Sequence, residues 1–208
     1  IILLIACKRD PDKRLIIKEI QQIENGLLPK VIIEGEEKGG FTIHERMAHY
    51  SVPGVSMACM DGGESVWAKG YGYTSFDSLK AVDELTLFQA ASISKPVAAM
   101  AALSLVEKGE IGLETNVNQY LKGWQVEENE FTREQKVTLR GLLSHSAGLT
   151  VHGFRGYTYK EEVPEVVQIL NGEAPANSDP IHPFCVPGTQ YSYSGGGYTL
   201  MQKMLSDV

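Results

Sequence analysis

A short polar motif at the start of an unusually apolar segment is the feature that most constrains this chain. Ser92 and Lys95 stand three residues apart, and every residue from 97 to 103 is apolar. Apolar residues on all sides of a helix are typical of a helix that is buried in a core. The sequence therefore predicts a buried helix over residues 93–108, with a serine at its N-terminal end.

That placement would bring two reactive side chains together. The first turn of a helix offers unpaired backbone N–H groups and the positive end of the helix dipole, and both stabilise a developing oxyanion. Lys95 lies one turn beyond Ser92 on the same side, and burial lowers the pKa of a lysine toward the range useful for a base. The alternative is a capping Ser92, followed by a Lys95 whose ammonium extends to solvent.

A second segment, residues 187–198, combines a turn, tyrosines and three consecutive glycines. Such glycines let the backbone pass close to a helix or a ligand. The residues that follow have the spacing of a helix that buries one face: Tyr198, Leu200, Met201 and Met204. The sequence predicts that Tyr193 is held at the turn from which this helix departs.

Three motifs in this order resemble those of the serine β-lactamases and penicillin-binding hydrolases. They are Ser-x-x-Lys at 92–95, Leu-Leu-Ser-His-Ser-Ala-Gly-Leu at 142–149, and Pro-Gly at 187–188 leading into Tyr-Ser-Gly at 193–195 and Gly-Tyr at 197–198. The likeness is strongest to the class C branch and its esterase and D-aminopeptidase relatives. It implies an α/β (α+β) fold in which an antiparallel sheet flanked by helices adjoins a mainly helical region, with the active-site cleft between them.

The resemblance also implies a mechanism through an acyl-enzyme, acting on D-alanyl peptides, β-lactams or small esters. Ser92 would be the nucleophile, Lys95 and Tyr193 would share the general-base and general-acid work, and the Ser92 backbone N–H would help to hold the oxyanion. A loop histidine such as His145 is more often a structural hydrogen-bonding residue than an acid or base. No cofactor is expected, and no Cys/His spacing resembles a metal site.

The chain departs from the family pattern at two points. The class C motif Tyr-x-Asn has Gly195 in its third place, and the later Lys-Thr-Gly or His-x-Gly motif is absent from the 208 residues. The expectation is a catalytic domain over residues 41–208 that stops before its final strands. A second function therefore stays open, namely a surface lipoprotein that keeps the fold for recognition without turnover.

The N-terminal segment has two interpretations. Residues 1–7 are apolar up to a terminal cysteine, and Leu4-Ile5-Ala6-Cys7 resembles a bacterial lipobox. In that reading residues 1–7 are the end of a signal peptide, and a lipid on Cys7 anchors the protein to a membrane of the bacterial cell envelope, on its periplasmic or extracytoplasmic side. The alternative is a buried N-terminal strand.

Residues 8–40 are expected to form a helix and a spacer. The helix would begin at Asp10-Pro11 and end at Asn25-Gly26. Its apolar stripe would consist of Ile16, Ile20, Ile23 and Leu27.

Turn and capping signals predict the remaining elements. Thr42 and Glu45 form a capping box for a short helix, and residues 55–60 and 65–73 form a β-hairpin about a turn at 61–63. Thr138 caps a helix over 139–144, and residues 171–188 form a long loop.

Charge and cysteine content limit the partners. The net charge of −7 and the pI near 5.3 leave no basic stripe for nucleic acid, so the expected partner is a small-molecule or peptide substrate. A disulfide between Cys59 and Cys185 and two free thiols are both compatible with the sequence, and the oligomeric state is open.

Overall fold

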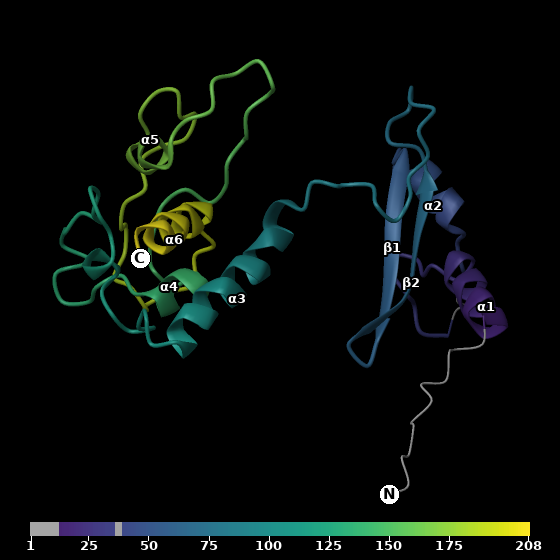
Figure 1. The fold of residues 1–208 in the computed structure, drawn as a ribbon, viewed down its shortest axis with the longest axis horizontal. Helices are drawn as coiled ribbons and strands as arrows, with labels where there is room; N and C mark the ends of the chain where they lie inside the picture. The colour runs from purple at the N-terminus through teal and green to yellow at the C-terminus, as the bar shows by residue number, and fades with distance from the viewer. Residues whose placement is uncertain (1–12, 36–38) are drawn as a thin grey trace, which may run out of the picture. The chain divides into compact units, whose positions relative to one another are not determined.

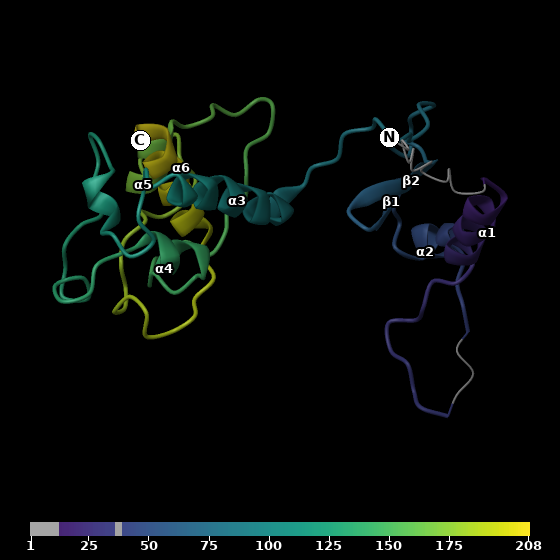
Figure 2. The ribbon, with the colours of Figure 1, turned by 60° about the horizontal axis from the view of Figure 1, so that its bottom comes forward.

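The computed structural model describes residues 13–35 and 39–208, and the chain divides into two compact units, residues 1–89 and 90–208 (Figures 1 and 2). The lipobox expected around Cys7 lies outside the described residues. Within these residues, no helix has the length and apolar character needed to cross a membrane.

The first unit contains two helices and a hairpin. Its elements are α1 (Lys13–Glu24), α2 (Ile43–His49), β1 (Gly54–Asp61) and β2 (Glu64–Gly72). Helix α1 ends next to Asn25-Gly26, as predicted, and its stripe residues are half-buried. The capping box at α2 is also confirmed, because the Thr42 hydroxyl accepts from the Glu45 N–H and the Glu45 carboxylate accepts from the Thr42 N–H.

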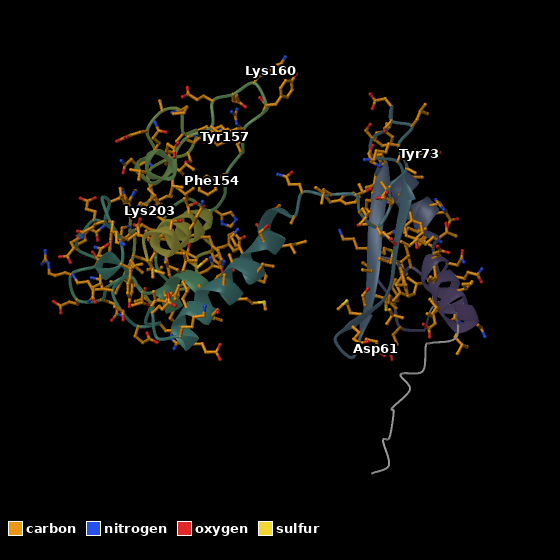
Figure 3. The ribbon with its side chains drawn as sticks, in the orientation of Figure 1. Asp61, Tyr73, Phe154, Tyr157, Lys160 and Lys203 are labelled. Carbon is orange, nitrogen blue, oxygen red and sulfur yellow. The ribbon has the colours of Figure 1, made fainter. Side chains whose placement is uncertain are left out.

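The predicted hairpin is confirmed, with β2 displaced by one residue toward the N-terminus. The strands pair antiparallel with Gly54 opposite Gly72, and an irregularity follows Cys59. Figure 3 labels Asp61 at the tip, where two glycines with positive φ make the turn. Trp67 and Tyr71 are buried on one face of β2, and the Lys69 ammonium on the same face pairs with Glu24 of α1. Helix α1 therefore packs beside the hairpin.

The second unit is mainly helical. It holds α3 (Ser94–Glu107), α4 (Leu139–Leu143), α5 (Val166–Asn171) and α6 (Gly195–Asp207), together with two 3-10 helices at Ala91–Ile93 and Val117–Gln119. Its core is built from aliphatic and methionine side chains of all four α-helices and of the loops between them. The largest fully buried members are Leu139, Leu142, Leu149, Leu170, Leu200, Met201, Met204, Val117 and Pro183.

Helix α3 lies close to its predicted bounds. A 3-10 turn over Ala91–Ile93 precedes it, so Ser92 lies just before the α-helix, which begins one residue later than predicted. Within residues 90–208 the helix is buried on one face: Ala102 is fully buried, but Val97 and Met100 are 67% and 72% exposed. An apolar composition signals that burial is favourable, but each face still needs a packing partner, and residues 90–208 supply one for the Ala102 face only.

Helix α6 begins as predicted, directly after Tyr193-Ser194. The Ser194 hydroxyl accepts from the Gly197 N–H and caps the helix. Gly196 is buried, and a Cβ there would lie 2.8 Å from an Ile181 side-chain carbon and 3.0 Å from the Thr150 carbonyl oxygen. The glycines thus allow the close backbone approach that the sequence indicated. Lys203, further along α6 (Figure 3), donates to the Lys122 carbonyl.

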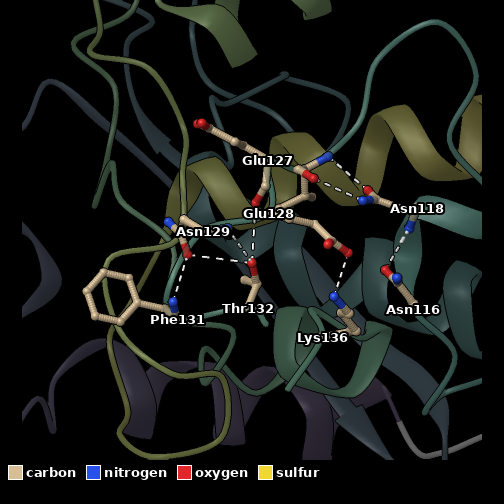
Figure 4. A network of polar contacts seen from close by, with 9 residues as sticks. Asn116, Asn118, Glu127, Glu128, Asn129, Phe131, Thr132 and Lys136 are labelled. Carbon is tan, nitrogen blue, oxygen red and sulfur yellow. Dashed lines mark hydrogen bonds and ion pairs between the residues drawn. The ribbon is translucent and has the colours of Figure 1, made fainter. Parts of the chain in front are cut away.

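The loops of this unit are ordered by side-chain to backbone hydrogen bonds. The Asn118 side chain accepts from the Val126 N–H and donates to the Val126 carbonyl (Figure 4). The Asn129 side chain accepts from the Phe131 N–H. Thr138 caps α4, as predicted, and residues 172–194 form a loop that extends six residues beyond the predicted end. Helix α5 was not anticipated from the sequence.

The two described cysteines are free thiols. Cys59 lies on β1 in the first unit and Cys185 lies in the loop before α6 in the second.

Candidate active site

The structure brings the three predicted site residues into contact. The Lys95 ammonium donates to Ser92 Oγ across 3.2 Å, and the Tyr193 hydroxyl donates to the same oxygen across 2.9 Å. All three residues belong to the unit formed by residues 90–208. Lys95 therefore turns toward Ser92, in contrast to the alternative of an ammonium that only extends to solvent.

Local backbone geometry presents Ser92 outward. Ala91 has φ 45, and the 3-10 turn that contains Ser92 leads directly into α3. A non-glycine residue in the left-handed region is strained and is common beside functional groups. The Ser92 side chain is exposed, so a carbonyl compound can approach it.

Aromatic rings surround the Lys95 ammonium. Its nitrogen lies 5.0 Å from the centroid of the Tyr193 ring and 5.4 Å from that of Tyr198, within the range of cation–π attraction. Lys95, and secondarily the hydrogen bond to Ser92, lowers the pKa of Tyr193. Burial raises the pKa of Tyr198, with Tyr193 adding to the effect. The two tyrosines beside one ammonium thus differ in acidity, and Tyr193 is the one suited to proton transfer.

His145 lies directly against Tyr193. Its Nδ1 accepts from the Ser194 N–H at 3.2 Å, and its ring centroid lies 4.2 Å from that of Tyr193. Burial is the main cause that lowers the pKa of His145, and the charges of Lys95 and His152 lower it further. His145 thus makes a structural hydrogen bond of the kind expected for a loop histidine.

Sequence reasoning assigned no role to three residues of the site, namely His152, Val151 and Ser194. His152 Nδ1 lies 3.1 Å from the Tyr193 carbonyl oxygen, and the neighbouring Val151, with φ 61, accepts from the Gly196 N–H. No motif marked either residue, because their roles depend on a contact between segments more than 40 residues apart. Ser194 could have been found, since a serine directly before a helical apolar pattern is a capping signal.

The structure gives a physical reason for glycine at 195. A Cβ at this position would lie 3.2 Å from both the His152 carbonyl oxygen and a ring carbon of Phe154, which is tighter than usual packing. A side chain in the third place of the motif would require the His152 carbonyl and the Phe154 ring to shift by a few tenths of an ångström. Residues 152–154 therefore pass so close to position 195 that glycine fits there better than the asparagine of Tyr-x-Asn.

Two large hollows are lined by residues of this unit. One, of about 550 Å³, runs between α3 and α6 beside Lys95, and its apolar walls include Phe154 and Met201. The other, of about 580 Å³, is lined by Trp124 and Asn171 and contains none of the three site residues. Among residues 13–35 and 39–208, no group of three His, Cys, Asp or Glu side chains is placed to hold a metal ion.

Known proteins resemble this chain in sequence and fold. Residues 42–208 match the family described as Beta-lactamase. A penicillin-binding protein of Bacillus subtilis (strain 168) is 28% identical over 70% of this chain and 30% of its own length, and an esterase of Burkholderia gladioli is 33% identical over 42% and 22%. The octameric penicillin-binding protein homologue from Pyrococcus abyssi superposes with a TM-score of 0.62, at 24% identity over 79% of this chain and 37% of that one. The chain spans less than half the length of these relatives.

Proposed function

The chain belongs to the beta-lactamase family, and we propose that it carries the reacting residues of a serine hydrolase that works through an acyl-enzyme. One observation carries the proposal: Ser92 Oγ lies within hydrogen-bond distance of both the Lys95 ammonium and the Tyr193 hydroxyl. A serine becomes a useful nucleophile when a neighbouring base removes its proton, and here two candidate bases contact the same oxygen.

Acylation would proceed in one addition and one elimination. The pair accepts a proton in its singly deprotonated form, which the lowered pKa of Tyr193 favours as a phenolate beside the Lys95 ammonium. As Ser92 Oγ attacks the carbonyl carbon, its proton passes to this phenolate, and the carbonyl oxygen gains the negative charge. The Ser92 backbone N–H is one donor to that oxyanion. The proton held by the pair then passes to the leaving group as its bond to the carbonyl carbon breaks, which leaves the acyl group on Ser92.

Deacylation would use the same groups in reverse. A water molecule gives a proton to Lys95–Tyr193 as its oxygen attacks the ester carbon, and Ser92 Oγ recovers a proton as the ester bond breaks. The lowered pKa of Tyr193 supports this cycle, because a phenol that ionises more easily can both accept and return a proton.

The proposed substrates are D-alanyl peptides, β-lactams or small esters. The similarity to a penicillin-binding protein and to an esterase supports this range. Because the chain spans only part of the length of these relatives, the choice among the three classes is a property of the whole protein.

The competing proposal is a binding protein that has lost turnover. Gly195, which replaces the asparagine of the class C motif, is the observation in its favour. In either case we propose attachment to the bacterial cell envelope through a lipid on Cys7.

Labelling with a fluorophosphonate and with a fluorescent penicillin separates the two proposals. We expect the protein to be labelled on Ser92, Ser92→Ala to lose the label, and Ser94→Ala, a matched control two residues away, to keep it. Labelling that survives in Ser92→Ala would refute the assignment of the nucleophile. No labelling of the wild-type protein by either probe would favour the binding protein.

A further inference from the structure

We propose that His145 is the positioning residue for Tyr193, which it holds by clamping the backbone on both sides of it. The inference rests on the proposed function, because it concerns how the tyrosine reaches Ser92. The His145 carbonyl oxygen accepts from the Ser192 N–H at 2.8 Å, and His145 Nδ1 accepts from the Ser194 N–H at 3.2 Å. One residue therefore binds both chain neighbours of Tyr193.

The His145 ring adds a third contact. It lies against the Tyr193 ring with centroids 4.2 Å apart and planes tilted by 33°. His152 also contacts this tyrosine, with ring centroids 5.0 Å apart and its Nδ1 3.1 Å from the Tyr193 carbonyl oxygen. The Tyr193 backbone and ring are thus held by two histidines, while the hydroxyl stays directed at Ser92 Oγ.

The backbone of His145 is unusual in a way that fits this role. Its φ is 56, in the left-handed region, directly after the short helix α4. This conformation is costly for a residue with a Cβ and persists only where the surroundings enforce it. With this backbone, the carbonyl oxygen and the imidazole of one residue both bind the segment 192–194. A glycine would adopt the same turn but would supply neither Nδ1 nor the ring.

The clamp also requires a neutral ring. A nitrogen that carries a proton cannot accept a hydrogen bond, so Nδ1 binds the Ser194 N–H only while it is unprotonated. Burial and the nearby positive charge lower the pKa of His145, which favours that form. The titratable groups that face the ring are Lys95 from α3, Tyr198 from α6, and His152, Tyr191 and Tyr193 from the loops.

The test follows the Tyr193 phenol directly in the full chain. Tyrosine labelled with ¹³C at Cζ reports the ionisation of each ring by NMR, and Tyr193→Phe assigns the signal. We expect His145→Ala to move the Tyr193 titration upward toward that of an ordinary tyrosine, because the phenol loses its fixed place beside Lys95. His145→Asn should stay close to wild type, since its side-chain oxygen can accept from the Ser194 N–H and asparagine tolerates positive φ. His182→Ala, at an exposed histidine outside the cluster, is the control.

Turnover provides the second readout. With an activated ester, His145→Ala should lower kcat about 10-fold to 100-fold with KM nearly unchanged, and His145→Asn should recover most of kcat. Recovery by asparagine is not expected from a histidine that itself transfers protons.

An unchanged Tyr193 titration in folded His145→Ala would overturn the inference, whether or not the wild-type protein hydrolyses any substrate. If His145→Ala does not fold, an NMR titration of the wild-type protein tests the inference instead. The Ser194 amide resonance should shift as the His145 ring titrates, and a Ser194 signal that is indifferent to that titration would overturn the clamp. A failed labelling experiment at Ser92 would affect the proposed function and leave both NMR tests intact.

Discussion

The Tyr193 hydroxyl donates to Ser92 Oγ across 2.9 Å, although 101 residues separate the two in the chain. Ser92 stands in the 3-10 turn before α3, and Tyr193 stands one residue before the cap of α6. The contact thus joins the N-terminal ends of α3 and α6. The backbone at each end fixes the position of the residue that precedes the helix.

Tyr193 and Tyr191 should differ sharply on substitution. Tyr193→Phe removes the hydroxyl that contacts Ser92, so we expect acylation by an activated ester to slow by about 10²-fold to 10⁴-fold. Tyr191 is 71% exposed and contacts His145 edge-on, so Tyr191→Phe should change the rate by only a few-fold. Steady-state and burst kinetics check both variants. A large loss of acylation rate in Tyr191→Phe together with a normal rate in Tyr193→Phe would show that Tyr191, and not Tyr193, is the proton-transfer residue.

Lys95→Arg distinguishes a base from a fixed charge. Arginine keeps a cation near the tyrosine rings but does not give up its proton in proteins. If Lys95 takes part in proton transfer, Lys95→Arg and Lys95→Met should both lower kcat/KM by about 10²-fold to 10⁴-fold. Near-normal kcat/KM for the arginine variant alone would mean that Lys95 acts only through its charge.

Two glycines with similar backbones offer a matched pair for stability. Gly148 has φ +68, and a Cβ there would lie 2.5 Å from the Cys185 carbonyl oxygen, whereas Gly188 has φ +86 and open space around it. Gly188→Ala should cost about 1–2 kcal/mol for the left-handed conformation, and Gly148→Ala about 1–3 kcal/mol more for the collision. Urea denaturation in a Trp67→Phe background, where Trp124 reports on the second unit, measures the difference. Equal losses would contradict the predicted collision.

The stability of the second unit should fall as the pH drops below the ordinary histidine pKa of 6.5. The pKa of His145 is lowered in the fold, so between that lowered value and 6.5 the unfolded chain binds a proton that the folded chain does not. Stability from this residue is therefore present above pH 6.5 and is lost as the pH falls through the folded pKa. His145→Asn should flatten this part of the profile of unfolding free energy against pH, and an unaltered profile would argue against the lowered pKa.

The lipid anchor is tested at Cys7. If Leu4-Ile5-Ala6-Cys7 is a lipobox, the protein expressed in bacteria from its full gene should fractionate with membranes, and Cys7→Ser should release or misprocess it. Cys59→Ser is the control, because it leaves the motif intact. Mass spectrometry that finds an unmodified Cys7 inside an intact N-terminus would exclude the anchor.

Local signals in the sequence were enough to define many of the elements. Three of these signals involve backbone groups only a few residues away, so a short sequence pattern is enough to predict their geometry. They are the Thr42–Glu45 capping box, the Gly62-Gly63 turn and the Thr138 cap. The same holds for the spacing of Ser92 and Lys95, which one helical turn brings together.

What the tertiary structure alone decided depends on contacts between distant segments. The clamp of His145 around Tyr193, the place of His152 and the close contacts that a Cβ at Gly195 would make all arise where residues 145–154 and 192–196 meet. The face of α3 that packs against the core of residues 90–208 is likewise set by contacts between distant segments. Apolar periodicity indicates that a helix face favours burial, but it does not indicate which segment covers that face. In the same way, the sequence around a loop histidine does not indicate which N–H group will donate to its ring. Tertiary packing decides those partners, because each buried polar group needs a hydrogen-bond partner and only the segments that pack next to it can supply one.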